Sequence, residues 1–141
     1  MKYSKATNYA LHTMVHLLRL PIGNRIGVQK LAEIQRLSPT YLSKILTKLA
    51  KSGLIESTPG VNGGYQVAKP KHEISFLDVI LAIEGDANFF TCSFSHHAGC
   101  HIEQVMLNVE QNMKHELDKK LLIDIANQVD NQCKNRHKNT L

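Results

Sequence analysis

Two thiols and three imidazoles lie close together between residues 92 and 101. Thiolates and imidazoles are ligands of zinc, copper and iron-sulfur centres, and a thiolate is also the form of cysteine that oxidants attack. This composition predicts a sensing loop with two alternative chemistries. Thiol oxidation would use Cys92 and Cys100. Metal binding would draw its ligands from the set Cys92, His96, His97, Cys100 and His101.

Oxidation is favoured by the position of Cys100, directly before a long stretch of helical periodicity. The positive end of a helix dipole would stabilise a thiolate there. Cys92 can then act as the resolving thiol, provided that the two Cα atoms come within about 7 Å. The metal alternative, zinc or an iron-sulfur cluster, has ligands spaced less regularly than paired Cys-x-x-Cys knuckles. A third interpretation is that the histidines are solvated and the cysteines are incidental small hydrophobic residues.

Three further candidates lie outside this loop. His12 and His16 are one helical turn apart, and they either chelate a metal or pack in the core. Cys133 lies in a basic tail and could pair between subunits. The odd number of cysteines, three, argues against a framework of structural disulfides. The sequence shows no nucleophile with a recognisable base and no phosphate-cradling glycine loop, so we do not expect an enzyme.

The elements that position these residues begin with three predicted helices. Ser4 is a candidate N-cap for the first helix, which ends before Pro21. A short helix follows over residues 28–35. Ser38, followed by proline, starts a third helix that ends at Gly53. We expect the third helix to bury its apolar side chains Leu42, Ile45, Leu46 and Leu49.

After the third helix the periodicity changes from helical to extended. Residues 54–57 and 65–69 predict two strands, joined by the turn-rich segment 58–64. Ser75 and Asp78 then form a capping box ahead of a fourth helix, whose end is marked by a glycine at position 85. These signals predict a two-stranded hairpin between the third and fourth helices.

A long apolar stripe follows the Cys/His loop. Its members recur at alternating three- and four-residue steps, which fits either a helix packed on the core or a helix paired with a second subunit. A helix over residues 101–118 would be about 27 Å long and would project beyond a small domain. A shorter helix over 121–129 and a frayed basic tail are expected after it. We expect two subunits to meet along the stripe Ile102, Val105, Met106, Val109 and Met113.

The predicted fold class is mainly α with a small β-hairpin: a winged helix-turn-helix domain plus a long C-terminal dimerisation helix. The expected division is a DNA-binding domain over 1–85, a Cys/His sensor loop over 86–100, and a dimerisation helix with a tail over 101–141. In such a domain the third helix enters the major groove and the hairpin lies along the DNA backbone.

The charge distribution supports DNA as the partner of this domain. The chain has a net charge of +5, and its central helices and hairpin carry few acidic residues. Clustered cations neutralise phosphates and release counterions. Thr40, Tyr41 and Lys44 start the third helix and are candidates for contacts with base edges. The cations of this region are Lys30, Arg36, Lys44, Lys48 and Lys51, with Lys69 and Lys71 beside the hairpin.

A family resemblance covers nearly the whole chain. It is carried by the opening YSKATNYALHTMVHLL, by the block LSPTYLSKILTKLAKSGLIESTPGVNGGYQVAKP, and by ISFLDVILAIEG followed by a Cys-containing loop and a long helix. These segments resemble the Rrf2 family of bacterial winged-helix regulators. The resemblance implies a homodimer joined through the long helix and repression by promoter occlusion. It places Ser38, Thr40, Tyr41 and Lys44 on the recognition helix and Asn62, Gly63 and Gly64 in the wing. The charge distribution adds Lys48 and Lys69 to this predicted DNA-binding set.

The sequence departs from the cluster-binding members that it resembles. In those members a loop with three cysteines holds an iron-sulfur cluster. Here Cys92 and Cys100 resemble the first and last of the three, and the middle cysteine is missing. Asn8 stands where the family pattern has an acidic ligand on the first helix. The departure favours redox sensing by Cys92 and Cys100 over a bound cluster.

The sequence therefore predicts a DNA-binding transcriptional repressor that binds a palindromic duplex as a homodimer and responds to redox or thiol-reactive signals. One alternative is a metal- or iron-sulfur-binding regulator. Another is a thiol- or metal-handling protein whose winged helix contacts proteins, because fold does not fix function. Polar residues interrupt the apolar ones after Met1, and no run of about 18 apolar residues exists. We therefore expect a cytoplasmic protein without a membrane partner.

Overall fold

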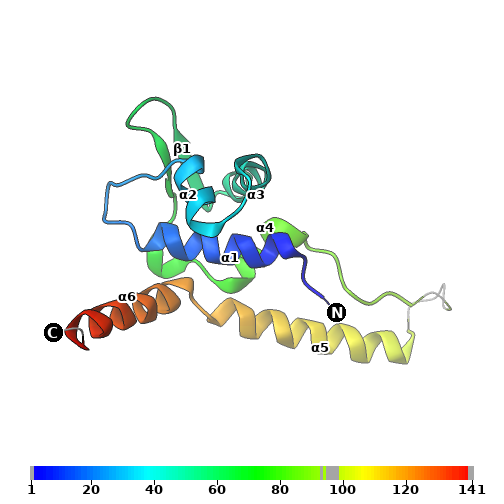
Figure 1. The fold of residues 1–141 in the computed structure, drawn as a ribbon. Coiled ribbons are helices and arrows are strands. Elements are labelled where there is room, and N and C mark those ends of the chain that lie inside the picture. Colours follow the sequence, from blue (N-terminus) through cyan, green and yellow to red (C-terminus); the bar gives the residue numbers. More distant parts are fainter. Residues whose placement is uncertain (1, 93, 95–98, 140–141) are drawn as a thin grey trace.

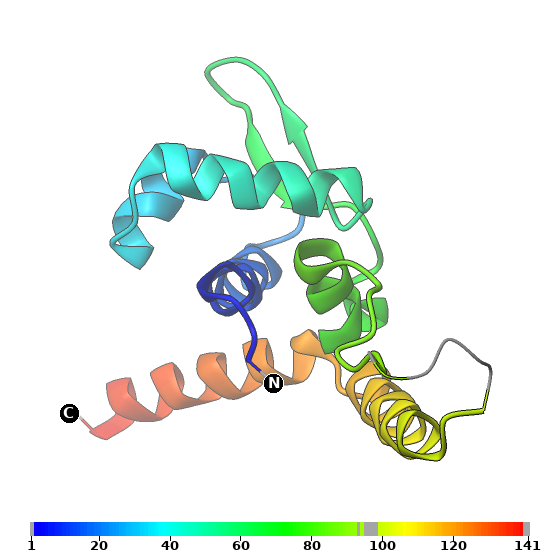
Figure 2. The same cartoon turned by 90° about the vertical axis from the view of Figure 1, so that its right-hand side faces the viewer.

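The computed structural model describes residues 2–92, 94 and 99–139, with side chains through residue 136. The first three helices are α1 (Lys5–Leu18), α2 (Val28–Gln35) and α3 (Pro39–Lys51), as the sequence predicts. In Figures 1 and 2, α1 occupies the middle of the molecule, with α2, α3 and the hairpin on one side. The last two helices lie on the opposite side of α1.

Local side-chain contacts explain where these helices begin and end. The Ser4 hydroxyl accepts the backbone N–H of Thr7 at 3.3 Å, and the Ser38 hydroxyl accepts that of Tyr41 at 3.1 Å. Both predicted N-caps are therefore confirmed, and each satisfies a donor that the helix itself cannot pair. Between α2 and α3, Arg36 takes the left-handed conformation with φ 56°, which ends α2 in a tight turn.

The hairpin consists of β1 (Ile55–Thr58) and β2 (Gly64–Val67), paired antiparallel with Ile55 opposite Val67. It is also attached to the loop before α2. Tyr65 and Ile26 exchange two backbone hydrogen bonds, of 2.8 and 3.1 Å, so the hairpin gains a bridge on its second edge. The hairpin is thus joined to the helix-turn-helix rather than projecting as an independent ribbon.

Helix α4 (Phe76–Glu84) follows a short 3-10 turn, η1 (Lys71–Glu73), that the sequence did not predict. The predicted capping box is confirmed. The Ser75 hydroxyl accepts the Asp78 N–H at 3.1 Å, and the Asp78 carboxylate accepts the Ser75 N–H at 3.0 Å. Two donors at the start of α4 are satisfied by this reciprocal pair.

Helix α5 (His101–Lys119) matches the long helix that the stripe predicts. Its C-terminal end is joined to the start of α4 by an isolated bridge between Ser75 and Leu121. Two backbone hydrogen bonds flank this bridge, from Phe76 N–H to the Lys120 carbonyl at 2.9 Å and from Leu122 N–H to the Ile74 carbonyl at 3.1 Å. One end of α5 is therefore fixed to the body.

Helix α6 (Leu122–Asn139) is longer than the sequence predicted. The prediction of a frayed tail after about residue 130 is wrong, because the helix continues to Asn139. Residues 122–139 contain no glycine or proline to end it. A side-chain pair also holds its middle, where Nε of Arg19, the C-cap residue of α1, lies 2.7 Å from Asp130 Oδ1.

One hydrophobic core joins α1, α3, α4 and the start of α6. The prediction for α3 is confirmed, since its buried residues are the four apolar ones expected. Within the described residues, no helix is long and apolar enough to cross a membrane. The largest fully buried side chains include Met14, Leu17, Leu31, Leu42, Leu46, Leu49, Leu54, Ile74 and Leu122.

Candidate DNA-binding surface and thiol site

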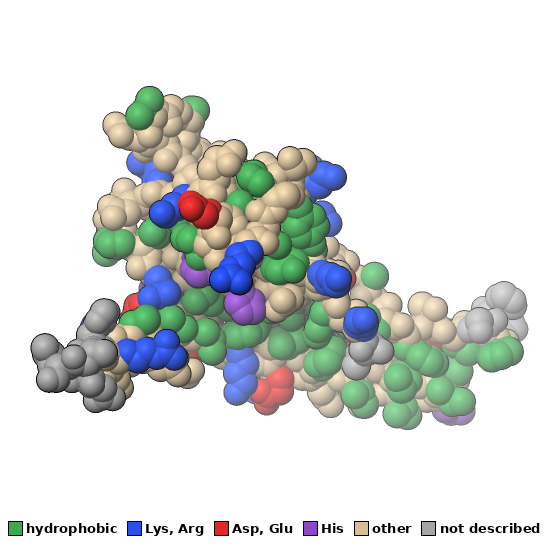
Figure 3. Space-filling model, viewed as in Figure 1, with side chains coloured by type: hydrophobic (Ala, Val, Ile, Leu, Met, Phe, Trp, Pro, Cys, Tyr) green, Lys and Arg blue, Asp and Glu red, His purple; other side chains and the backbone are tan. Residues whose placement is uncertain are grey.

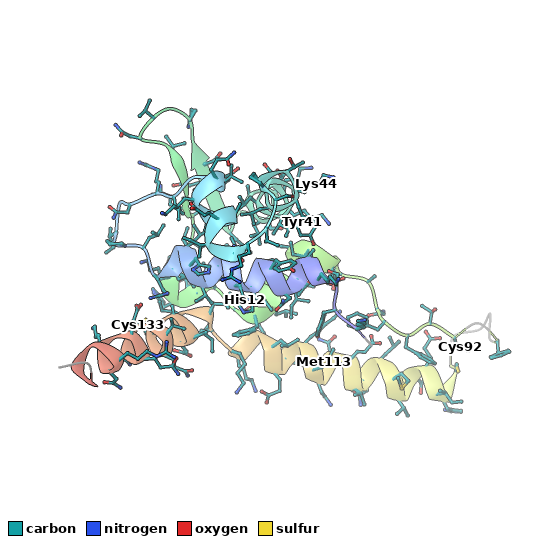
Figure 4. All side chains as sticks on the ribbon, in the orientation of Figure 1. His12, Tyr41, Lys44, Cys92, Met113 and Cys133 are labelled. Carbon is teal, nitrogen blue, oxygen red and sulfur yellow. The ribbon has the colours of Figure 1, made fainter. Side chains whose placement is uncertain are left out.

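The N-terminal half of α3 presents the side chains predicted to read bases. Thr40 and Lys44 are exposed, and Tyr41 is 36% exposed. Figure 4 shows Tyr41 and Lys44 on α3, on the side of the molecule away from α5 and α6. The Ser38 hydroxyl accepts a backbone hydrogen bond as the N-cap, and it keeps its proton for one further bond.

Tyr41 is partly exposed on this surface and also packs against the body of the protein. Its ring packs edge-on against the ring of Tyr9 from α1, with centroids 5.9 Å apart and planes at 88°. Edge-to-face pairs of this kind stabilise a fold by about 0.5–1.5 kcal/mol. The orientation of Tyr41 on α3 is therefore set in part by α1.

Two of the predicted cations have partners within the molecule. Lys48 is exposed, but it is near enough to Glu84 to contribute to the lowered pKa of that carboxyl group. The larger causes are hydrogen bonds from Thr7 and then Ser4 to the carboxylate. Lys71 donates to the carbonyls of Leu18 and Leu20 at 3.0 and 2.9 Å, so its ammonium satisfies the end of α1. Lys44 and Lys69 are both exposed.

The glycines of the hairpin are required by packing inside the chain. A Cβ on Gly63 would lie 2.0 Å from the Thr58 carbonyl oxygen, and one on Gly64 would lie 2.7 Å from the backbone of Ile26. Gly64 also has φ 132°, which disfavours other residues. Beside them Asn62 and Val61 are exposed at the tip of the hairpin. On the face shown in Figure 3, Lys and Arg side chains are spread over the helix-turn-helix part.

The two loop cysteines meet at the N-terminus of α5. Cys100 is the N-cap residue of this helix, and the carboxylate of Glu103, in its first turn, accepts the backbone N–H of Cys92 at 3.1 Å. The backbone N–H of Glu103, followed by the Cys92 thiol, lowers the pKa of the Cys100 thiol, while the Glu103 carboxylate opposes this shift. Both cysteines are half-buried and not in a disulfide.

Side chains of α5 hold the preceding loop along the helix. Lys114 Nζ lies 3.2 Å from Asp86 Oδ1. Further along the loop, the Glu110 carboxylate accepts the Phe89 N–H at 3.3 Å. The Glu103 carboxylate accepts the Cys92 N–H at 3.1 Å. Glu110 is 4% exposed, and its second carboxylate oxygen has no hydrogen-bond partner. The loop from residue 86 to residue 92 is thus tied to α5 at three points.

The imidazole candidates are not gathered with the thiols. His96 and His97 lie outside the described residues, and His101 is exposed on α5. On α1, His12 is exposed and His16 is half-buried, so neither is a core residue. Burial, followed by Arg19 and His12, lowers the pKa of His16. Among the residues that the structure describes, no group of three or more His, Cys, Asp or Glu side chains could hold a metal ion.

Cys133 lies on α6, far along the chain from the loop, as the labels of Figure 4 show. It is exposed, and its sulfur lies 3.8 Å from Arg19 Nη2. The sequence analysis did not identify Glu103 or Glu110. Their role depends on loop residues 11 and 21 positions away, and only the path of the loop reveals it. The sole sequence signal was an acidic residue in the first turn of a predicted helix.

Comparisons with known proteins agree with this architecture. The model of the Rrf2 family, described as an iron-dependent transcriptional regulator, matches residues 3–128. YffB of Lactococcus lactis, named as an HTH-type transcriptional regulator, is 42% identical over 90 residues, which span 64% of this chain and 58% of that relative. YwgB of Bacillus subtilis, named likewise, is 28% identical over 92% of this chain and 86% of its own length.

A solved structure shares the fold. The oxidized form of Staphylococcus aureus CymR is 29% identical, with a TM-score of 0.71, over 89% of this chain and 96% of that one. The winged helix-turn-helix and these relatives define a DNA-binding transcriptional regulator. The chain belongs to the Rrf2 family.

Among the described residues, no group of Cys, His, Asp or Glu side chains fits the iron named in the family description. Asn8, at the position that the family pattern gives to an acidic ligand, supplies a neutral amide in place of a carboxylate. An iron-sulfur cluster needs four thiolate or equivalent ligands.

Proposed function

We propose that this regulator is a repressor that binds a palindromic operator as a homodimer and releases it when Cys92 and Cys100 are oxidised. The observation that carries the proposal is the position of Cys100 as the N-cap residue of α5, with Cys92 held by a hydrogen bond to Glu103 in the first turn of the same helix. In this proposal residues 1–85 bind DNA, residues 86–100 sense the signal, and residues 101–141 dimerise.

Several features of the thiol site support its sensing role. Cys100 is the N-cap residue of α5, and its lowered pKa increases the fraction of thiolate, which is the reactive form. Cys92 is held at the first turn of the same helix through Glu103 and would resolve an oxidised Cys100. The site is half-buried rather than enclosed, so a small oxidant has access.

The surface of α5 supports dimerisation along the predicted stripe. Ile102, Val105, Met106 and Val109 are 69, 62, 39 and 57% exposed in the single chain. Figure 3 shows hydrophobic side chains along α5. An exposed apolar row on a helix of 19 residues is typical of a helix that pairs with a second subunit. The same row on two copies can form a self-complementary contact about a two-fold axis.

The DNA-contacting set is proposed from exposure and position. Thr40, Tyr41 and Lys44 would reach base edges from the start of α3, while Ser38 would donate to a phosphate. Asn62 would contact the minor groove or the backbone from the hairpin tip. Gly63 and Gly64 serve the hairpin turn itself and bring Asn62 to the tip. Lys48 and Lys69 would meet phosphates, Lys48 more weakly because Glu84 offsets part of its charge.

The test uses duplexes selected from random DNA by the reduced protein. Hydrogen peroxide should weaken operator binding of the parent by about tenfold, a typical size for allosteric coupling. Cys100→Ser should bind like the reduced parent and keep its DNA under peroxide, because its first oxidation step is removed. Binding is measured by fluorescence anisotropy and free thiols by titration, with Cys133→Ser as the matched control that should still respond.

Two results would contradict the sensing role. One is operator release by Cys100→Ser at the same peroxide concentration as the parent. The other is stoichiometric iron and sulfide in protein purified without oxygen. Absence of salt-sensitive binding to any selected duplex would contradict the proposed operator binding itself.

A further inference from the structure

Glu103 links the two cysteines of the thiol site through its position and its side chain. It lies in the first turn of α5, three residues after the N-cap residue Cys100. Its carboxylate accepts the backbone N–H of Cys92 at 3.1 Å, so Cys92 is held against the helical turn that follows Cys100.

The Glu103 carboxylate has two effects at this site. Its hydrogen bond holds the Cys92 backbone in place, and its negative charge raises the pKa of the Cys100 thiol, against larger contributions that lower it. The hydrogen bond to Cys92 is the effect that would favour disulfide formation.

We propose that Glu103 is a positioning residue that holds Cys92 ready to close a disulfide with Cys100. This inference rests on the redox role proposed above and adds the residue that controls its second step. The neighbouring ties, Glu110 to Phe89 and Lys114 to Asp86, fix the loop nearer its beginning. Of these three contacts between α5 and the loop, only the hydrogen bond of Glu103 involves a cysteine.

The reaction has two steps with a hydroperoxide as oxidant. The Cys100 thiolate attacks the peroxide, the O–O bond breaks, and Cys100 sulfenic acid and hydroxide form. The Cys92 thiol then attacks the sulfenic sulfur, an S–S bond forms, and the S–O oxygen leaves as water with the thiol proton. The two sulfurs lose two electrons in total, and the peroxide gains them. Glu103 is proposed to act on the second step.

The experiment separates the two steps in full-length protein carrying Cys133→Ser, so that only the thiol pair can react. Hydrogen peroxide is added, sulfenic acid is trapped with a dimedone probe, and disulfide is measured by intact mass. Three further changes are compared: Glu103→Ala, Glu103→Gln, and Glu73→Ala as a control. Glu73 is an exposed carboxylate in η1, outside both the loop and α5. Circular dichroism checks that each variant is folded.

Glu103→Ala should form sulfenic acid at least as fast as the parent but close the disulfide about tenfold more slowly, as expected when a hydrogen bond to a charged group is lost. Sulfenic acid should therefore accumulate. Glu103→Gln should restore closure, because its amide oxygen still accepts the Cys92 N–H. It should also form sulfenic acid faster than the parent, because the opposing charge is gone. Glu73→Ala should behave like the parent.

The outcomes distinguish this inference from the function on which it rests. If Glu103→Ala partitions between sulfenic acid and disulfide like the parent, the positioning role is wrong while redox sensing stands. If Glu103→Gln closes as slowly as Glu103→Ala, the hydrogen bond is not the cause and the role is wrong. If the parent forms the disulfide without releasing its operator, the sensing proposal fails and the role of Glu103 stands. If the parent forms no disulfide, both fail.

Discussion

At the scale of single residues, Tyr41 shows how a DNA-facing side chain can also belong to the fold. Its ring is only partly exposed because it packs on Tyr9. Replacing it with alanine would remove a candidate base contact and an aromatic pair at once. A phenylalanine keeps the ring and removes only the hydroxyl, so it isolates the polar contact.

Tyr41→Phe and Lys44→Ala should each weaken binding to the selected operator by about 1–3 kcal/mol while changing binding to random DNA less, because both residues are proposed to reach base edges. Lys69→Ala should instead weaken both duplexes equally and reduce the salt slope by about one. Salt titrations of operator and random duplexes measure both effects. Equal losses on the two duplexes for Tyr41→Phe would remove its hydroxyl from the base-reading set.

Sequence alone was sufficient for residues whose partners are local. Ser4, Ser38 and Ser75 each cap a helix through an N–H three residues ahead, a distance at which the pattern is readable. It was insufficient for Glu84, whose carboxylate binds Ser4 across 80 positions, and for Glu103. Such contacts depend on how α1 meets α4 and on how the loop runs along α5, which no local pattern encodes.

At the scale of elements, α5 presents separate faces for separate tasks. Glu103, Glu110 and Lys114 lie on the face that holds the loop. Four of the five stripe residues lie on another face and are exposed, while Met113 is half-buried and its sulfur lies 3.9 Å from the Tyr3 hydroxyl. A seven-residue step from Glu103 to Glu110 covers nearly two helical turns, which keeps both carboxylates on one line. The helix can therefore contact its loop and a second subunit at once.

Replacing Val105 and Val109 with Glu should convert the proposed dimer into monomers, because charge would enter an apolar seam without partners. Operator affinity should fall by at least about tenfold, because a monomer can bind only one of the two half-sites. Analytical ultracentrifugation and anisotropy measure these two effects. Gln104→Glu adds the same kind of charge to an exposed position of α5 outside the stripe and should remain dimeric. A monomeric parent would contradict the prediction.

The order and type of the helices and the hairpin were predictable because each has its own periodicity and caps. The end of α6 was not. Its last residues are polar and basic, which indicated a frayed tail, but they lack any helix breaker. Composition also could not show that the hairpin is bridged to Ile26, since a single exchanged pair of hydrogen bonds has no periodicity.

At the scale of the whole molecule, the helix-turn-helix and the hairpin are joined into one unit, the reading unit, which is the part proposed to contact DNA. The Ile26–Tyr65 bridge and the close approach of Gly64 to Ile26 join the hairpin to the loop before α2. Helix α4 packs on both α1 and α3, and α5 packs on α4. A dimer therefore presents two such units whose separation depends on α5.

The proposed dimer should require half-sites one helical turn of DNA apart, about 34 Å, or a multiple of that distance. Inserting about 5 base pairs between the half-sites of the selected operator turns one half-site to the opposite face and should abolish cooperative binding. Inserting about 10 should restore part of it. Gel-shift titrations test the series. Equal affinity for all spacings would mean that the units bind independently.

If α5 turns about the bridge between Ser75 and Leu121 as a hinge, it acts as a lever. The helix has 19 residues, so it is about 28 Å long, and Cys100 lies at the end opposite the bridge. A displacement of roughly 2.5 Å at that end, the scale of closing an S–S bond, corresponds to a rotation of only about 5° at the hinge. Two copies related by a two-fold axis would add their rotations, so the angle between the two reading units would change by about twice that amount.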